Sequence, residues 1–302
     1  MASLLLASNT YQSNTGSNTA VQNYGGAIHD AFANAGWVQV GSTYFASNAS
    51  SWSTVVANGS STVWTAQECW RMNDALANVA PVYITWALVT GTGYANSPSL
   101  IFRLGSGAVT TGASNGVNVT INLTGPLSGN FQVRGIANNS LNNCYFCGDT
   151  DRIMLVMDVA SPMLISIERT HDAGGNNTTE GVLFFMAGTA YNGTGTGLAL
   201  LFWSPSSGAT ASEGTTGLFT PANSLSGTGN IIQLYPCYTS RGLFLNPAMN
   251  YMFGSIYNTT PYSQLSFPYY GAMHNYLTLG ANLWTNRSSV TASSLNYMIR
   301  WE

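Results

Sequence analysis

The sequence predicts an α+β protein dominated by β-structure, with antiparallel sheets in a sandwich-like arrangement and one amphipathic helix near the N-terminus. Three observations favour this class. Short runs of β-branched and aromatic residues recur along most of the chain. Clusters of Gly, Asn and Ser separate these runs, as in antiparallel strands joined by turns. One stretch near the N-terminus has the three- and four-residue apolar spacing of a helix.

The chain begins with residues 1–18, which are mostly small and polar and show little periodicity. We expect an extended N-terminal arm that becomes ordered only against neighbouring proteins. The helix follows, because Thr19 can cap its first turn and Gly36 can end it in a left-handed conformation. Gly25 and Gly26 lower its intrinsic stability. Its apolar positions are Val21, Tyr24, Ala27, Ile28, Ala31, Phe32 and Ala35.

Strands are expected over most of the chain after the helix. The run Val82–Val89 is apolar and follows Pro81, a residue that is tolerated at the start of a strand. Asp74–Asn78 can form a single helical turn. The other predicted strands are Trp37–Val40, Thr62–Trp64, Cys69–Met72, Leu100–Leu104, Asn118–Leu123, Phe131–Arg134, Ile153–Val159, Leu164–Arg169, Val182–Met186, Leu198–Trp203, Ile231–Tyr235, Tyr251–Tyr257, Tyr276–Leu279 and Tyr297–Trp301.

Three Gly-, Ser- and Asn-rich stretches are expected as long loops, namely Gly105–Gly116, Asp172–Glu180 and Ser204–Gly229. Long loops in a compact domain are uncommon unless they contact something, so these are candidates for intersubunit surfaces. Mobile surface loops are the alternative. Residues 19–302 are expected to form a single β-rich domain, and a subdivision, if there is one, falls near 105–116.

Charge is scarce in this chain. Charged residues make up 6% of the sequence, against roughly 25% in an ordinary soluble domain, and all eight basic residues other than histidine are arginines. Polarity comes instead from amides and hydroxyls. Because a freely diffusing monomer relies on surface charge for solubility, this composition favours a body held in an assembly.

The same composition excludes several partners. The net charge of −3 and the scattered arginines argue against a nucleic-acid-binding surface, which needs clustered basic residues. No run reaches the ~20 apolar residues of a membrane-spanning helix, so we expect no membrane span. The N-terminus lacks the basic region of a signal peptide. We therefore expect synthesis in a cytoplasm.

The cysteines are Cys69, Cys144, Cys147 and Cys237. The middle two form a single Cys-x-x-Cys motif whose flanking residues suggest a turn. Zinc would need two more ligands from distant segments, and a thioredoxin-like motif would need a strand followed by a helix. Buried free thiols are the leading interpretation, and a disulfide formed after release into an oxidising medium remains open.

Acidic residues gather modestly between positions 149 and 180. The sequence from Asp149 to Asp151 begins like a calcium-binding loop but lacks the glycine and glutamate of an EF-hand. A carboxylate pair for glycoside hydrolysis cannot be placed from sequence. We favour solvated or arginine-paired acids and expect no metal and no cofactor. The acids concerned are Asp149, Asp151, Asp158, Glu168, Asp172 and Glu180.

Nucleophilic catalysis is not indicated either. Gly112–Gly116 matches Gly-x-Ser-x-Gly, but it lacks the preceding strand and following helix of a nucleophile elbow. His29, His171 and His274 are not placed as partner bases and are expected to be structural. A phosphate-binding loop would need a lysine, which this chain lacks. We therefore expect no catalytic residue and no enzymatic activity.

Aromatic residues are abundant, with 16 Tyr, 12 Phe and 8 Trp. Tyr and Trp flanked by Asn and Ser suit adaptable contact surfaces and sugar stacking, although cores take most aromatic residues. The segment 257–270 contains Pro261 and Pro268 and is interpreted as a contact loop rather than a strand. The candidate contact surface is Tyr257, Tyr262, Phe267, Tyr269 and Tyr270.

The order of several short segments resembles a group of tailed-bacteriophage virion proteins. A capped helix runs into Ala35–Gln39, then come Glu68–Leu76, Ala80–Ile84 and a Gly-rich segment around 100–107, with a further patch at Glu168–Gly174. The resemblance implies a structural subunit in the tail, baseplate or fibre region, or on the capsid. It also implies that the partners are other virion proteins and copies of the chain itself. No catalytic residue carries over from it.

Two other functions remain open at this stage. Tyr and Trp platforms with Asn side chains suit a carbohydrate- or host-receptor-binding module that takes a host surface glycan. A hydrolase acting on envelope polysaccharide through an Asp/Glu pair is a further alternative. A structural virion protein is the leading interpretation.

Overall fold

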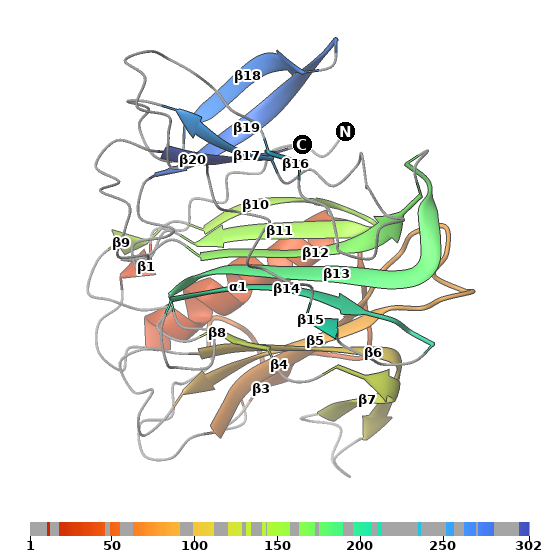
Figure 1. Cartoon of the computed structure of the whole chain (residues 1–302). Helices are drawn as coiled ribbons and strands as arrows, with labels where there is room; N and C mark the ends of the chain where they lie inside the picture. Colours follow the sequence, from red (N-terminus) through yellow and green to blue (C-terminus); the bar gives the residue numbers. More distant parts are fainter. Residues whose placement is uncertain are drawn as a thin grey trace.

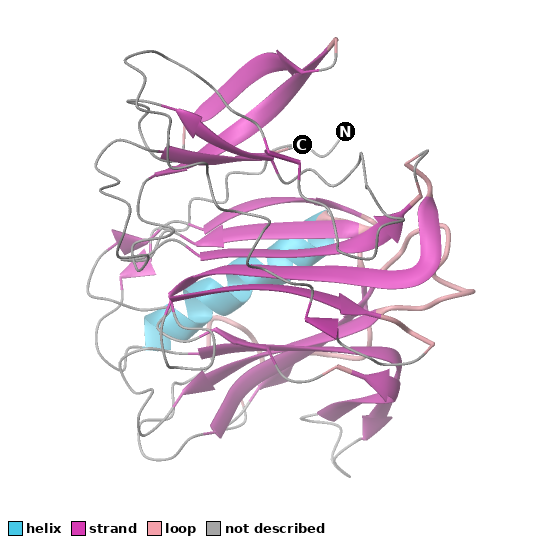
Figure 2. Cartoon of the chain, viewed as in Figure 1, coloured by secondary structure: helices cyan, strands magenta, loops and turns pink. Residues whose placement is uncertain are grey.

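The computed structural model places β-structure along most of the described chain, with a single described helix near the N-terminus (Figure 2). This confirms the predicted fold class. Of the expected N-terminal arm it describes only β1 (Tyr11–Gln12) and Asn18, so the arm as a whole is untested. The described residues are 11–12, 18–45, 49–54, 63–90, 99–111, 120–128, 131–133, 141–142, 144–157, 163–172, 175–189, 196–206, 211–212, 235–236, 252–256, 263–269, 271–280 and 296–301.

The helix, α1 (Asn18–Asn34), ends as the sequence predicts. Gly36 has φ of 81°, a left-handed conformation in which a side chain would be strained. Its N–H donates to the Ala33 carbonyl at 3.0 Å, and the N–H of Trp37 donates to the Phe32 carbonyl at 3.2 Å. This pair of bonds is a Schellman motif, which satisfies carbonyls that the last helical turn leaves free.

Gly25, inside α1, has a packing role that does not follow from its low helix propensity. A Cβ built on Gly25 would overlap the ring of Trp52. Trp52 in turn stacks on Trp86 at a centroid distance of 5.4 Å and meets Phe45 edge-on at 4.9 Å. The missing side chain at Gly25 therefore leaves the space in which the Trp52 ring packs against the helix.

The first sheet has seven strands, with the path β2-β4-β5-β6-β7; β3 pairs with β4, and β8 pairs with β6. Alternate residues of β5 face the core, and Trp86 lies directly opposite Phe102 of β6. The strands are β2 (Val38–Gln39), β3 (Tyr44–Phe45), β4 (Val63–Arg71), β5 (Tyr83–Thr90), β6 (Ser99–Thr111), β7 (Thr120–Leu127) and β8 (Phe131–Val133).

The second sheet is a six-stranded antiparallel meander whose strands follow chain order. Residues such as Ile153 and Ile167 face the core, and Met154 and Leu183 on the opposite face are also buried. The strands are β10 (Cys144–Asp149), β11 (Arg152–Met157), β12 (Met163–His171), β13 (Asn177–Thr189), β14 (Thr196–Trp203) and β15 (Ala211–Ser212).

The two sheets share one hydrophobic core, which makes the body a sandwich (Figure 1). Phe102 of the first sheet contacts Phe184 of the second at a ring distance of 5.9 Å. The helix joins the same core, because Phe32 stacks on Trp70 of β4 at 5.6 Å. No helix in the described part of the chain has the length and hydropathy needed to cross a bilayer.

The C-terminal part forms a third, five-stranded sheet in the order β16-β17-β20-β19-β18, which lies above the second sheet in Figure 1. Strand β1 pairs separately with β9 (Leu141–Asn142). The strands of the third sheet are β16 (Tyr235–Pro236), β17 (Met252–Ile256), β18 (Gln264–Tyr269), β19 (Ala272–Gly280) and β20 (Asn296–Arg300).

The predicted loop 105–116 is wrong in its first half, because β6 continues to Thr111. The pairing of β6 with β7 shifts register between Gly105 and Gly107, so the glycines mark a bulge rather than a loop. A Cβ on Gly105 would lie 3.0 Å from the Leu123 Cβ, so its absence also admits β7. The rest of the predicted loop lies outside the described residues.

The other predicted loops are shorter than expected where they are described. Strand β13 begins at Asn177, so only 172–176 connects it to β12, and Asp172 accepts a hydrogen bond from the Asn176 N–H at 2.9 Å. Of the predicted loop 204–229, Ala211–Ser212 forms β15 and most of the remainder lies outside the described residues.

The expectation that 257–270 forms a loop is wrong for its second half, where Gln264–Tyr269 is β18. Proline is compatible with this strand because β18 is at the end of the sheet order and Pro268 needs no N–H partner there. The Cys-x-x-Cys flank is likewise a strand rather than a turn, since Cys144–Asp149 forms β10.

Candidate functional site

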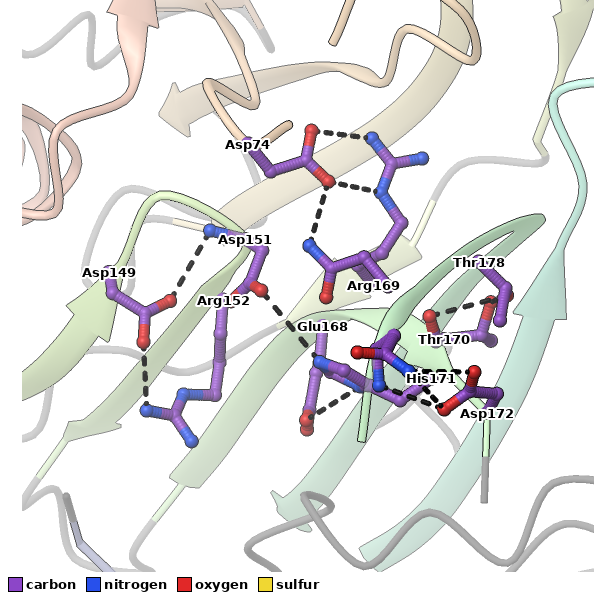
Figure 3. A network of polar contacts seen from close by, with 12 residues as sticks. Asp74, Asp149, Asp151, Arg152, Glu168, Arg169, Thr170, His171, Asp172 and Thr178 are labelled. Atoms are coloured by element: carbon purple, nitrogen blue, oxygen red, sulfur yellow. Dashed lines mark hydrogen bonds and ion pairs between the residues drawn. The ribbon is translucent and has the colours of Figure 1, made fainter. Parts of the chain in front are cut away.

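Charged side chains gather where the turn between β10 and β11 meets the end of β12 (Figure 3). The register places Arg152 directly opposite Asp149 on one side and Glu168 on the other. Arg152 donates from Nη2 to Asp149 Oδ2 at 3.1 Å. The N–H of Asp151 donates to Asp149 Oδ1 at 3.3 Å, which shapes the turn.

Glu168 is the most buried acid of this group, with 1% of its surface exposed. Burial raises its pKa to about 7, although the positive charges of Arg152 and His171 oppose the shift. Its Oε2 atom is buried and has no hydrogen-bond partner among the described residues. Glu168 thus carries a proton far more readily than an exposed glutamate does.

His171 lies between two carboxyl groups. Its Nε2 is 3.7 Å from Asp151 Oδ2, and its Nδ1 is 3.6 Å from Glu168 Oε1. Burial lowers the pKa of His171, but the contact with Asp151 and the charge of Glu168 outweigh it and the net shift is upward. The pKa of Asp151 is lowered despite its burial, because His171, Asp149 and Asn177 hydrogen-bond to its charged form.

The pKa of Asp149 shifts in the opposite direction to that of Asp151. Burial and a side-chain hydrogen bond with Asp151 raise the pKa of Asp149 to about 6, although the charge of Arg152 opposes the shift. The two carboxyl groups therefore compete for one proton, which Asp149 holds more tightly.

A second buried pair, Asp74 and Arg169, adjoins this group (Figure 3). Arg169 donates from Nε to Asp74 Oδ2 at 2.7 Å and from Nη2 to Asp74 Oδ1 at 3.0 Å. Its Nη1 donates to the Ala80 carbonyl at 2.9 Å, and Asn177 donates to Asp74 Oδ2 at 3.2 Å. Because Asp74 follows β4 and Arg169 lies on β12, the pair fastens the first sheet to the second.

A third polar group lies on the core side of β4, where Glu68 alternates with Ala66 and Trp70. Glu68 is fully buried. Its Oε1 receives hydrogen bonds from His29 Nδ1 at 2.8 Å and from the Thr43 hydroxyl at 2.6 Å. Its Oε2 receives one from Trp70 Nε1 at 2.8 Å.

His29 joins α1 to this buried carboxylate. The hydrogen bond to Glu68 raises the pKa of His29, against the lowering effect of burial. Protonated His29 therefore forms an ion pair that holds α1 against β4. About 30% of its side chain is exposed, so solvent protons reach it.

Three carboxyl groups of these clusters face the protein interior. Glu68, Asp74 and Glu168 are each buried and directed at partners inside the protein. A hydrolytic carboxylate pair must instead flank a substrate. Among the residues that the structure describes, no group of three or more His, Cys, Asp or Glu side chains is arranged to hold a metal ion.

Cys69 is a buried free thiol, and burial raises its pKa to about 12. Cys147 is also buried. Cys144 and Cys147 are three residues apart on β10. Cys237 lies outside the described residues.

The predicted contact surface is partly described. Phe267 and Tyr269 lie on β18, whereas Tyr257, Tyr262 and Tyr270 are outside the described residues. Outside them too lie Gly112–Gly116 and Asp158. His274 lies half-buried on β19.

Sequence reasoning missed the two buried acids nearest the N-terminus. Glu68 carried a usable signal, because a glutamate that alternates with Ala66 and Trp70 points into the core and needs buried donors. The partner of Asp74 lies 95 residues away, and no local pattern indicates it. A comparison with protein-family models finds no match, and neither does a comparison with curated proteins.

Proposed function

We propose that the protein is a structural subunit of a bacteriophage particle, in the tail, baseplate or fibre region. It is made in the host cytoplasm, and its partners in the virion are other virion proteins and further copies of itself. The resemblance of Ala35–Gln39 and Glu68–Leu76 to phage virion proteins supports the class. The location of the protein's few charges carries the proposal.

Most charges of the described residues are used inside the molecule. Among the acids with described side chains, Glu68, Asp74 and Glu168 are buried, and Asp30 and Glu180 are exposed. The half-buried acids are Asp149, Asp151 and Asp172. The arginines with described side chains are all buried or half-buried: Arg71, Arg103, Arg152 and Arg169.

An exterior with so few ions has a physical consequence. Net surface charge keeps free proteins apart through mutual repulsion, and this exterior supplies little of it. Uncharged polar and apolar surface can be covered by a neighbour without the desolvation penalty that buried ions cost. Such a surface is therefore suited to permanent contact in an assembly.

The interior suits the same role. The two sheets share a core and are joined by the buried Asp74–Arg169 pair. A building block must keep its shape while neighbours bind to it. The buried ion pair supports this because it has one low-energy geometry.

The alternative of a glycan- or receptor-binding module gains no support from the described residues. Stacking on a sugar needs an exposed aromatic ring. The tryptophans with described side chains are all buried or half-buried: Trp37, Trp52, Trp70, Trp86, Trp203 and Trp301.

The proposal is tested by mass spectrometry of density-gradient-purified particles of the phage that encodes the chain. Chymotrypsin is the appropriate protease, because the chain has only eight sites for trypsin but 36 aromatic residues from 16 Tyr, 12 Phe and 8 Trp. We expect its peptides in constant ratio to the major virion proteins across the gradient, with a phage replication protein as the negative control. Absence of the chain from the particles would refute the proposal.

A further inference from the structure

Strand β18 is the outermost strand of the third sheet, where it pairs with β19 and ends the sheet order (Figure 1). The hairpin register runs from Gln264 opposite Leu277 to Tyr269 opposite Ala272. Gly271 in the connecting turn has φ of 80°, as tight hairpin turns require.

The hydrogen-bond pattern identifies which backbone groups point outward. The N–H of Thr278 donates to the Ser263 carbonyl at 3.0 Å, so Ser263 belongs to the bonded pairs of the hairpin. Bonded and non-bonded pairs alternate along antiparallel strands. The backbone groups of Gln264, Ser266 and Pro268 therefore point away from β19. The Trp301 N–H donates to the Asn275 carbonyl at 2.7 Å, which confirms the same alternation on β19.

This outer edge lacks most of the devices that protect edge strands. Gln264, Ser266 and Pro268 are all exposed. Natural proteins block such edges with charged side chains, proline or bulges. Proline is used here only at position 268, beside the turn, and residues 263–280 contain no Asp, Glu, Lys or Arg. Among the described residues, none is hydrogen-bonded to the N–H groups of Gln264 and Ser266.

We propose that β18 pairs with β18 of a second copy of this chain, antiparallel and about a two-fold axis. In this register Gln264 faces Ser266 of the second copy, and Ser266 faces its Gln264. Each of these two pairs exchanges both backbone hydrogen bonds. Leu265 meets its own counterpart on the axis, and the two five-stranded sheets become one continuous sheet.

A second copy is the occupant because the edge is its own complement. The outward N–H and C=O groups belong to Gln264 and Ser266, which are two residues apart. A two-fold axis through Leu265 therefore brings each N–H of one copy to a C=O of the other. Self-pairing of a charged edge would place like charges together, and this edge carries none. Pro268 lacks an N–H, so the bonded stretch stops there and the register is fixed. The inference rests on the proposed function only in that both require self-assembly.

The test compares Ser266→Pro with Ser266→Ala by sedimentation equilibrium of the full chain. Both variants lose the side-chain hydrogen bond from Ser266 to Asn275, which is 2.6 Å long, but only proline loses the outward N–H. We expect wild type and Ser266→Ala to dimerise alike, and the dissociation constant of Ser266→Pro to rise roughly tenfold or more. A monomeric wild type, or dimerisation of Ser266→Pro equal to that of Ser266→Ala, overturns the proposal.

A cross-linking variant gives a positive readout that does not depend on weakening the dimer. Leu265→Cys places two thiols opposite each other in a non-bonded pair, where Cβ atoms lie about 4.5–5.5 Å apart. We expect an intermolecular disulfide under mild oxidation. Ser263→Cys, whose counterpart lies several residues away along the strand, is expected to remain uncross-linked. Equal cross-linking of both variants overturns the register.

Unchanged thermal unfolding and near-ultraviolet circular dichroism establish that Ser266→Pro is folded. If it does not fold, Gln264→Lys replaces it, since lysine on an edge strand opposes pairing and leaves the backbone donors in place. Detection of the chain in virions together with a monomeric wild type would overturn only the strand pairing. Absence from virions together with a β18-dependent dimer would overturn only the proposed function.

Discussion

Replacing Asp74 with alanine leaves the Arg169 guanidinium in the protein interior without its carboxylate. Arg169 is fully buried, and it would lose the bonds of 2.7 and 3.0 Å that now neutralise it. Asn177 would lose an acceptor at the same time. The bond to the Ala80 carbonyl would remain, but a neutral carbonyl does not balance a buried positive charge.

The expected loss of stability follows from this geometry. Removing one partner of a buried ion pair costs about 3–5 kcal/mol, because the other charge remains desolvated. The whole free energy of unfolding of a domain is about 5–15 kcal/mol. Asp74→Ala is therefore expected to remove about a fifth or more of the stability of the protein.

The measurement is urea unfolding at pH 7, followed by circular dichroism. We expect the midpoint of Asp74→Ala to fall with little change in slope. Glu180→Ala is the matched control, because Glu180 is an exposed acid, and its effect is expected to stay within about 0.5 kcal/mol.

The double variant Asp74→Leu, Arg169→Met separates lost charge from lost packing. Removing both ions leaves no uncompensated charge, so the double variant is expected to be more stable than Asp74→Ala by about 2 kcal/mol or more. A loss below about 1 kcal/mol in Asp74→Ala would refute the account of the pair. A double variant less stable than Asp74→Ala would refute it as well.

Three further predictions concern the helix and the buried titratable groups. Gly25→Ala is expected to destabilise the protein by about 1–3 kcal/mol in urea unfolding, because its Cβ would overlap Trp52. Gly26→Ala is the control, because its Cβ would lie 4.0 Å from the Trp52 side chain. It is expected to be neutral or stabilising by up to about 1 kcal/mol. The pKa of Glu168 rises from 4.5 to about 7 on folding, so its contribution is fully favourable below pH 4.5 and is lost as pH rises through 7. Glu168→Gln is therefore expected to gain up to about 3 kcal/mol relative to wild type between pH 5 and 8, and a constant difference across that range would contradict this. Because the pKa of His29 is raised on folding, its ion pair with Glu68 stabilises the protein fully below pH 6.5, and this stability is lost as pH rises through the raised pKa. The free energy of unfolding of His29→Gln is expected to lack this pH dependence.

The parts of the fold that depend on local sequence could be predicted. The end of α1 at Gly36 follows from a glycine after an apolar helical face. The strand β5 follows from an apolar run after a proline. The structure of glycine-rich segments was harder to predict. Gly105, for example, lies at a bulge and allows close strand packing, although glycine is equally compatible with a loop. Glycine content alone does not distinguish these uses.

The buried charges illustrate what sequence could not supply. Arg169 pairs with Asp74, and the choice of this acid depends on the packing of one sheet against the other. Strand β18 was missed because Pro261 and Pro268 suggested a loop. Pro268 is compatible with the strand only because its missing N–H points off the sheet edge. Both facts depend on tertiary position rather than on local pattern.

A surface with few charges cannot rely on charge complementarity to select its neighbours. Among the described side chains only Asp30 and Glu180 are exposed acids, and the proposed β18 contact contains no ion pair. Salt screens exposed charges over a Debye length of ~10 Å at 0.1 M and leaves backbone hydrogen bonds and apolar contacts nearly unaffected. Dimerisation should therefore be insensitive to salt. We expect the dissociation constant to weaken by less than about twofold between 50 and 500 mM NaCl in sedimentation equilibrium. A tenfold weakening over the same range would mean that ion pairs hold the contact, and the account of this surface as one that assembles without charge would fail.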